Sequence, residues 1–495
     1  MKIRNLISFL AISAFSVTGY SLDIQVEESG TLSELLKDAT DVTNLKVSGN
    51  INAADLFYLS EIKGISTLDL SDAVIGEYNN LRLRGKSQYD ANTIPSGCFA
   101  GSQLTSVSFP VTPGLIIGEA AFTASNLQTL EIPASVDSIG TGAFAACDGL
   151  TTVTLPVCRM GKSVFADCTG LETVNVGNAT VIAPSTFKGC TALVNVAGAE
   201  KIVKIGAQAF EGDKSLTVFN FGRKLTEIGE SAFASTGLLE ANLYDATNLK
   251  TLPSEVFADA ALTSIALPDG LTDVGNAAFF GNGQLQSVIL PSETITLGEH
   301  AFKGTDLSEL ELPEKLEEIG AYALLGQTGI KDLTLPSTLI FIGDHAMEGM
   351  TGLQSINVEK LGTAVPELGE SVWEGVNQQN VKLVVDEYFA DYFQNADQWK
   401  DFSFDITSGT DDIISDNTAD TGIKGRFVGT ELQVVSTNSE IDVLRLYDLS
   451  GRLLISVEPH DTVVNIDTAD FNGNVFLINV SLENRKSAAL KLGRR

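Results

Sequence analysis

Apolar and polar positions along this chain repeat with a period of about 23 residues between Cys98 and Gly375. Each repeat contains an alternating segment of type L-x-x-V-x-L-P, a segment that often carries an Ile-Gly pair, and an anchor residue that usually follows Ala. The anchor occurs thirteen times, at Phe99, Phe122, Phe144, Phe165, Phe187, Phe210, Phe233, Phe257, Phe279, Phe302, Leu324, Met347 and Trp373. Self-similarity at a fixed period of this length is typical of a solenoid, in which each unit buries its apolar face only against its neighbours.

The pattern inside one repeat predicts its local structure. The alternating segment predicts a short strand that stops at Pro. The Gly of the Ile-Gly pair allows a turn that a side chain would obstruct, and the x-x-A-F segment predicts a helical turn that inserts the anchor beneath the strand. Stacked in register, about thirteen such repeats predict a leucine-rich-repeat β-solenoid of parallel strands and short helical turns, roughly 60 Å long.

The segments that flank the repeats predict caps and a second domain. Residues 22–95 have strand-like runs at Leu45 and Leu68 around a helical pattern. Thr31 with Glu34 predicts a capping box at the start of a short helix. This part therefore predicts a leucine-rich-repeat-like N-terminal cap. The solenoid and its C-terminal cap are expected to cover residues 96–403. An aromatic stripe at helical spacing closes that end, formed by Tyr388, Phe389, Tyr392, Phe393 and Trp399.

Beyond this cap the pattern changes twice. Residues 404–421 are polar and acidic and predict a linker, and no calcium-binding loop of the required spacing occurs in them. From Gly425 onward, short alternating segments separated by turns predict a small antiparallel β-sandwich over residues 422–495.

The first 21 residues predict a secretory signal peptide. Lys2 and Arg4 precede an apolar run from Leu6 to Val17, and a cut is expected before Leu22. Removal of this segment would take the net charge from −31 to about −33. Such an acidic chain disfavours nucleic acid and anionic membranes as partners, and no later stretch is long and apolar enough to cross a bilayer.

Cysteine and histidine usage argues against an enzyme. Cys147, Cys168 and Cys190 each lie three residues after an anchor and predict a buried ladder, with a disulfide between stacked repeats left as the alternative. His300 and His345 occupy equivalent positions two repeats apart, and no H-E-x-x-H, G-x-S-x-G or C-x-x-C motif occurs. We therefore predict no catalytic residues, no cofactor and no metal ligands, although composition alone leaves a glycosidase-like carboxylate pair open.

The outward-facing strand positions are the informative ones, because the inward positions are used by the core. They are hydroxyl-rich in the first strands and acidic in later ones, which is either ordinary polar covering or a ligand footprint. The candidate ligand face comprises Ser106, Ser108, Thr129, Glu131, Thr152, Thr154, Thr173, Asn175, Glu240, Asn242, Glu309, Glu311, Asp332, Thr334, Ser355 and Asn357.

The repeat resembles the BspA-like leucine-rich repeats of bacterial surface proteins over residues 99 to about 403, in its L-x-x-V-x-L-P, I-G and A-F-x-G-C/N motifs. The resemblance implies a secreted or surface-bound adhesin, because some family members bind host matrix proteins such as fibronectin or fibrinogen. It transfers no ligand-binding residue to this chain.

The last domain resembles the C-terminal sorting domains of the type IX secretion system. The resemblance rests on the L-Y-D-L-S-G-R run from Leu446 to Arg452 and on the basic end from Lys491 to Arg495. The chain departs from that family at residues 474–476, which read N-V-F in place of the usual G-V-Y. An accessory domain that is retained without the export machinery is the alternative.

We therefore expect an exported, nonenzymatic protein, monomeric in solution, that recognises a host or neighbouring-cell macromolecule through the solenoid face. The expected partner is an extracellular protein, such as a matrix protein, or a surface glycan, without nucleic acid and without membrane insertion. Two other classes remain open: a structural or antigenic surface protein without a defined ligand, and a glycan-binding or glycan-handling protein.

Overall fold

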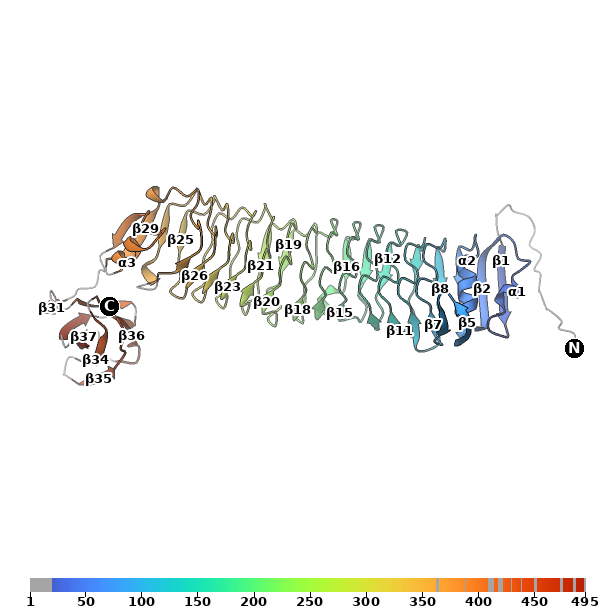
Figure 1. Cartoon of the computed structure of the whole chain (residues 1–495), viewed down its shortest axis with the longest axis horizontal. Helices are drawn as coiled ribbons and strands as arrows, with labels where there is room; N and C mark the ends of the chain where they lie inside the picture. The colour runs from blue at the N-terminus through green and yellow to red at the C-terminus, as the bar shows by residue number, and fades with distance from the viewer. Residues whose placement is uncertain are drawn as a thin grey trace.

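The structure is a computed structural model that describes residues 20–361, 365–387, 389–407, 414–416, 422–428, 430–437, 439–448, 452–471, 475–483 and 487–493. Figure 1 shows a long stack of rungs, one per repeat, between an N-terminal cap and a small C-terminal domain. This architecture confirms the predicted leucine-rich-repeat β-solenoid with an antiparallel β-domain after it. The predicted signal segment, apart from its last two residues, lies outside the described residues.

The N-terminal cap continues the stacking of the solenoid. Its strands β2 and β3 pair in parallel with one another, and β3 pairs with the first repeat strand β8, so that Leu45, Leu68 and Val107 lie in one row. The cap consists of β1 (Tyr20–Val26), α1 (Leu32–Leu35), β2 (Val42–Ile51), α2 (Ala53–Glu61), β3 (Thr67–Asp69), β4 (Ala73–Ile75), β5 (Tyr78–Leu83) and β6 (Lys86–Tyr89).

The capping box predicted at Thr31 and Glu34 is wrong, because the Thr31 side chain caps nothing. Asn52 and Asp55 form the box instead, at the start of α2. The buried Asp55 carboxylate also accepts hydrogen bonds from the amides of Gly30 (2.6 Å) and Leu32 (3.0 Å). One carboxylate therefore joins the starts of both helices, and this arrangement is invisible to a rule that examines one helix at a time.

The alternating segments form the first parallel ladder of the solenoid. Outside the short cap strands, neighbouring strands pair in register, for example Val153 with Val174. The ladder contains β8 (Ser106–Ser108), β10 (Thr129–Leu130), β12 (Thr152–Thr154), β14 (Thr173–Asn175), β16 (Asn195–Ala197), β19 (Glu240–Asn242), β21 (Ser264–Ala266), β25 (Asp332–Thr334), β27 (Ser355–Asn357), β29 (Lys382–Asp386) and β30 (Ser403–Thr407), with the short 3₁₀ turns Ala199–Lys201, Glu359–Leu361 and Gln378–Asn380 beside it.

The Ile-Gly segments form a second parallel ladder, where the sequence analysis expected only a turn. Its glycines are needed for close approach of successive rungs, because a Cβ at Gly140 would lie 2.4 Å from the Glu119 nitrogen. The ladder contains β7 (Thr93–Ile94), β9 (Leu115–Ile117), β11 (Val136–Ile139), β13 (Arg159–Met160), β15 (Val181–Ile182), β17 (Lys204–Ile205), β18 (Glu227–Ile228), β20 (Thr251–Leu252), β22 (Asp273–Val274), β23 (Thr296–Leu297), β24 (Glu318–Ile319), β26 (Phe341–Ile342) and β28 (Glu367–Leu368).

The anchor residues form the central column of the core, and all thirteen are buried. The ten Phe rings stack face to face, with centroid distances between 5.1 Å for Phe99–Phe122 and 6.1 Å for Phe257–Phe279. The anchor segment is a turn rather than a length of helix. The residues two before and two after each anchor have left-handed backbone, for example His345 (φ 54°) and Gly349 (φ 71°). These two positions turn the chain so that each anchor points inward.

A second interior column lies three residues after the anchors, and we call it the interior polar column. The predicted cysteine ladder is confirmed as part of it, since Cys147, Cys168 and Cys190 are buried and all five cysteines are free thiols. Each of these three thiols donates to the backbone carbonyl of the anchor in the preceding rung at 3.2 Å, as Cys147 does to Phe122. Asn282 (2.7 Å to Phe257) and Gln327 (2.8 Å to Phe302) donate to the same carbonyl in later rungs. The column satisfies acceptors that stacking would otherwise leave unpaired.

Asp213 occupies the same column and is fully buried, with neither carboxylate oxygen hydrogen-bonded. Burial raises its pKa from the ordinary 3.8 to about 9, and the nearby amides of Cys190 and Gly189 offset only part of this. At neutral pH the carboxyl group is therefore protonated.

The solenoid closes with α3 (Ala390–Asn395) and β30, beneath which Phe389, Phe393 and Trp399 are buried. Residues 404–407 were predicted as linker, but they belong to β30, because Phe404 pairs with Leu383 and packs against the core. Residues 408–413 and 417–421 of that linker, and Tyr388 of the aromatic stripe, lie outside the described residues. Tyr392 is partly exposed.

The C-terminal domain has two antiparallel sheets around its own apolar core, in which Leu432, Leu444 and Phe476 are buried. The sheets are β31-β38-β37-β34-β35 and β32-β33-β36. The strands are β31 (Ile414–Asp416), β32 (Ile423–Val428), β33 (Glu431–Ser436), β34 (Ile441–Tyr447), β35 (Leu453–Val457), β36 (Val463–Asp467), β37 (Val475–Leu482) and β38 (Ser487–Gly493).

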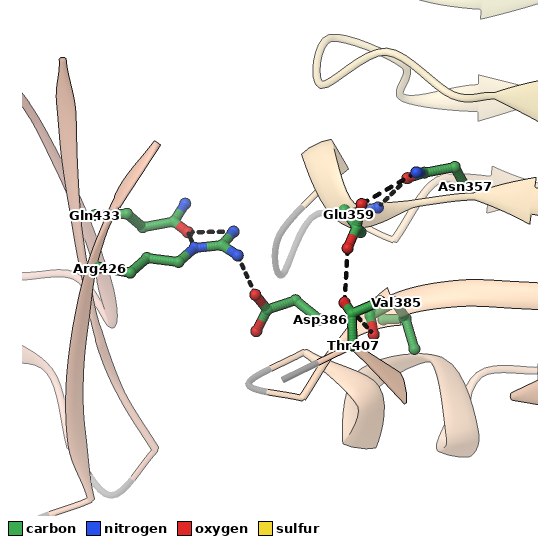
Figure 2. A network of polar contacts seen from close by, with 7 residues as sticks. All are labelled: Asn357, Glu359, Val385, Asp386, Thr407, Arg426 and Gln433. Carbon is green, nitrogen blue, oxygen red and sulfur yellow. Dashed lines mark hydrogen bonds and ion pairs between the residues drawn. The ribbon is translucent and has the colours of Figure 1, made fainter. Parts of the chain in front are cut away.

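This domain contacts the end of the solenoid through Arg426. Figure 2 shows its guanidinium between Gln433 of its own domain and the Asp386 carboxylate at the end of β29. Both charged side chains are largely buried, and Arg426 also lies over the Phe389 ring at 4.9 Å. On the solenoid side, Thr407 donates to Glu359 at 2.6 Å and ties β30 to the rung of β27, two strands before it. The last solenoid rungs therefore meet the C-terminal domain at a specific polar contact.

The central column generates a first prediction. Phe210→Ala should lower the free energy of unfolding by about 3–5 kcal/mol, because the ring is fully buried between two stacked neighbours. Thermal or denaturant unfolding measures this, with the exposed Asn220→Ala of the same rung as a control that should change stability little. Equal melting of the Phe210 variant and the parent would contradict the stacking.

A second prediction concerns pH. Because the folded-state pKa of Asp213 is raised to about 9, its stabilising contribution is complete below about pH 4 and is lost progressively as the pH rises towards 9. Asp213→Asn keeps a donor without the charge, so it should stabilise the protein at pH 7 by about 1–4 kcal/mol and flatten that part of the pH profile. Unfolding measured from pH 4 to 9 tests this, with Asp213→Ala as the variant without a donor. A pH profile unchanged by Asn would contradict the assignment.

Candidate binding face

The outward positions of the first ladder form two columns along one face of the rod. In each rung they flank a buried apolar residue, as Thr152 and Thr154 flank Val153. Register pairing carries each column from rung to rung, so Thr152 lies beside Thr173 and Thr154 beside Asn175. Side chains about 23 residues apart in sequence thus become neighbours on a continuous surface.

All sixteen predicted face residues are exposed or half-buried in the structure. They form separate groups, because the ladder is interrupted along the rod. Ser106 pairs with Thr129 in the first group, and Asp332 pairs with Ser355 in the last. Glu309 and Glu311 lie on a rung that is not assigned as a strand, where they flank the buried Leu310.

The candidate ligand face predicted from the sequence lacks the exposed apolar residues of the same columns in the middle rungs. Val218 is 62% exposed and Ile289 is 87% exposed, and Leu239 and Tyr244 are also exposed on nearby positions. These residues stand where the alternation predicts outward side chains. The alternation of the strand segments is therefore the sequence signal that places them on the face. The middle of the face is therefore mixed, with exposed apolar side chains such as Val218 beside polar and acidic ones such as Glu240.

Salt bridges join neighbouring rungs on both ladders, as Lys382 with Asp405 does on the first, but several carboxylates of the candidate face have none. On the second ladder, Lys204 pairs with Glu227 at 2.7 Å across neighbouring rungs. On the first ladder, Glu240, Glu309 and Glu311 are exposed and make no salt bridge within the described part of the chain. Negative charge on this face is therefore available to an outside partner.

Other surface features do not coincide with this face. Two shallow hollows of about 430 Å³ each lie elsewhere, one beside α2 and the first anchor and one at the Gly275 and Gly298 turns. Among the described residues, no helix has both the length and the apolar character that a membrane span requires.

A family model of BspA-type leucine-rich repeats matches residues 86–194, 157–261 and 250–379, which together cover more than half of the chain. The chain belongs to the BspA-type leucine-rich-repeat family. This agrees with the resemblance found in the repeat motifs and with the rung structure described above.

Several solved structures are similar to the chain. A leucine-rich repeat protein from Bacteroides ovatus is 19% identical, with a TM-score of 0.49, and the match covers 74% of this chain and 88% of that one. A leucine rich cell surface protein from Faecalibacterium prausnitzii is 19% identical, with a TM-score of 0.33 and coverage of 59% and 87%. The pneumococcal vaccine antigen PcpA is 16% identical, with a TM-score of 0.26 and coverage of 76% and 81%. A search of curated proteins found no match.

Proposed function

We propose that this protein is an exported, nonenzymatic binding protein that recognises an extracellular macromolecule with a basic surface through the strand face of its solenoid. The observation that carries the proposal is the contrast between a uniform core and a face whose exposed positions vary along the rod, from hydroxyl-rich first rungs to later rungs that mix apolar and acidic side chains. Membership of the BspA-type family supports a surface role, and the N-terminal signal segment supports export.

The apolar and acidic side chains of the face have complementary uses in binding. Exposed apolar side chains such as Ile289 supply area that becomes favourable when a partner removes it from water. The unpaired carboxylates of Glu309 and Glu311 attract a basic partner over a longer range and speed its approach. A protein of the extracellular matrix, with basic and apolar patches, fits this combination better than a neutral glycan, since Tyr244 is the only exposed aromatic among the apolar face residues named above.

The C-terminal domain completes the proposal as a sorting domain of the type IX secretion kind. Its antiparallel strands and the L-Y-D-L-S-G-R run support this role, although residues 449–451 of that run lie outside the described residues. The Arg426–Asp386 contact would hold such a domain against the last solenoid rungs while the chain is folded. The protein would then reach the outer surface or the medium after crossing the inner membrane.

Charge reversal on the face tests the binding proposal. Glu309→Lys with Glu311→Lys should slow association with immobilised extracellular-matrix proteins, most strongly at low salt, where electrostatic attraction is least screened. Association rates measured by surface plasmon resonance at several salt concentrations report the effect. The matched control is Glu318→Lys with Glu367→Lys on the second ladder, which makes the same charge change at exposed positions. Equal rates for the face variant and the parent at every salt concentration would remove this surface as the binding site.

Truncation tests the export proposal separately. A chain that lacks residues 422–495 should cross the inner membrane and remain in the periplasm, whereas the full chain should appear outside the cell, as measured by fractionation and immunoblotting. A full-length Arg426→Gln variant controls for loss of the contact at Asp386 alone and should still be exported. Normal surface display of the truncated chain would exclude a sorting role and leave the binding proposal intact.

A further inference from the structure

Three aromatic rings stack along the turn edge of the solenoid, outside the strand face. His300, Tyr322 and His345 each stand two residues before the anchor in three successive rungs. The ring centroids of His300 and Tyr322 are 4.8 Å apart, those of Tyr322 and His345 are 4.9 Å apart, and both pairs are nearly parallel. All three residues have left-handed backbone, so the turn and the stack together fix the direction of each ring.

Two carboxylates meet the ring at the end of this stack. Glu348 follows the anchor Met347, and Glu374 occupies the equivalent position in the next rung. Nδ1 of His345 lies 2.8 Å from Oε2 of Glu348 and 3.7 Å from Oε2 of Glu374. The three side chains can place one ligand atom each within 4.8 Å of one another. Two rungs of the solenoid thus bring one imidazole and two carboxylates to a single point.

The imidazole nitrogen at this point lacks a hydrogen bond. Nδ1 of His345 is shielded from solvent, and its contact with Glu348 is out of line for hydrogen bonding. No Lys or Arg forms a salt bridge with Glu348 or Glu374 within the described part of the chain. A buried nitrogen lone pair beside two uncompensated carboxylates is a ligand set that a cation would satisfy.

We propose that His345, Glu348 and Glu374 bind a divalent transition metal of the Zn²⁺ class. Mixed nitrogen and oxygen ligands suit such ions, whereas Ca²⁺ takes oxygen ligands and would leave the imidazole unused. Three protein ligands leave a coordination position open, and the 60% exposure of the Glu374 side chain places the site at the surface. The bound ion can therefore accept a water molecule or a ligand from outside.

The same stack contains a matched site that lacks the ligands. His300 occupies the equivalent position and stacks on the other face of Tyr322. In its rungs, however, Lys303 stands where Glu348 stands, and Leu325 stands where Glu374 stands. Burial and the neighbouring Lys303 ammonium lower the pKa of His300. A cation there would meet the single carboxylate of Glu299, 3.2 Å from His300 Nδ1, together with the Lys303 ammonium, so His300 should not bind metal.

Calorimetric titration of the metal-free full chain with Zn²⁺ tests the proposal. One saturable site per chain is expected at pH 7.5, and a similar titration with Ca²⁺ should give no such site. His345→Phe retains a stacked ring without the ligand and should weaken Zn²⁺ binding at least about 100-fold, and Glu374→Gln should weaken it at least about 10-fold. His300→Phe is the matched control and should leave the affinity unchanged. His460→Ala tests the looser cluster of His460 with Asp442 and Glu483 and should also leave it unchanged.

A gain-of-function variant distinguishes Zn²⁺ binding by this specific ligand set from adventitious binding. Lys303→Glu with Leu325→Glu should recreate the ligand set around His300 and raise the stoichiometry to two Zn²⁺ per chain, with folding checked by circular dichroism. A folded variant that still binds one ion would overturn the assignment of these positions as ligands. Absence of saturable Zn²⁺ binding, or unchanged binding by His345→Phe, would overturn the site itself and show that His345 only forms an ion pair with Glu348.

Discussion

The close stacking of one rung on the next is the constraint on which the rest of this structure depends. Each rung is too thin to bury its own apolar residues, so the anchor rings find cover only in the rungs above and below. Close stacking requires glycine where backbones approach, as at Gly140, and left-handed residues where the chain turns. It also brings carbonyl groups into the interior, and the interior polar column supplies their donors.

The same constraint explains why the interior polar column tolerates such different residues. Three residues after each anchor, a thiol or an amide can donate to the anchor carbonyl of the preceding rung, as Cys190 and Gln327 do, whereas the hydroxyls of Thr236 and Thr305 donate to the anchor of their own rung. Asp213 makes no such hydrogen bond, and burial of its carboxyl group without a partner is the physical reason that its pKa is raised. Ala260 and Met350 fill the same position without a donor, so burial constrains this position more strictly than hydrogen bonding does.

Because the core is nearly the same in every rung, the residues that distinguish one rung from another lie on the outside and at the two ends. On the strand face, exposed positions carry a changing sequence of hydroxyl, apolar and acidic groups. On the turn edge, equivalent positions in neighbouring rungs assemble clusters such as His345 with Glu348 and Glu374. At the C-terminal end, the largely buried Asp386 finds its partner in Arg426 of the next domain, so two units with separate cores are joined by a specific charge pair.

The sequence by itself determined the solenoid, the register of its thirteen anchors, the buried cysteine ladder and the outward direction of the strand-face residues. These follow from local periodicity, because a residue that must be buried recurs at the same place in every repeat. The second ladder, the left-handed turns and the bonds from Gly30 and Leu32 to Asp55 depended on tertiary structure, because each involves backbone from another rung or helix. The contact of Arg426 with Asp386 and the cluster at His345 were likewise decided only in three dimensions, since stacking brings together side chains whose separation of 26 to 40 residues carries no local signal.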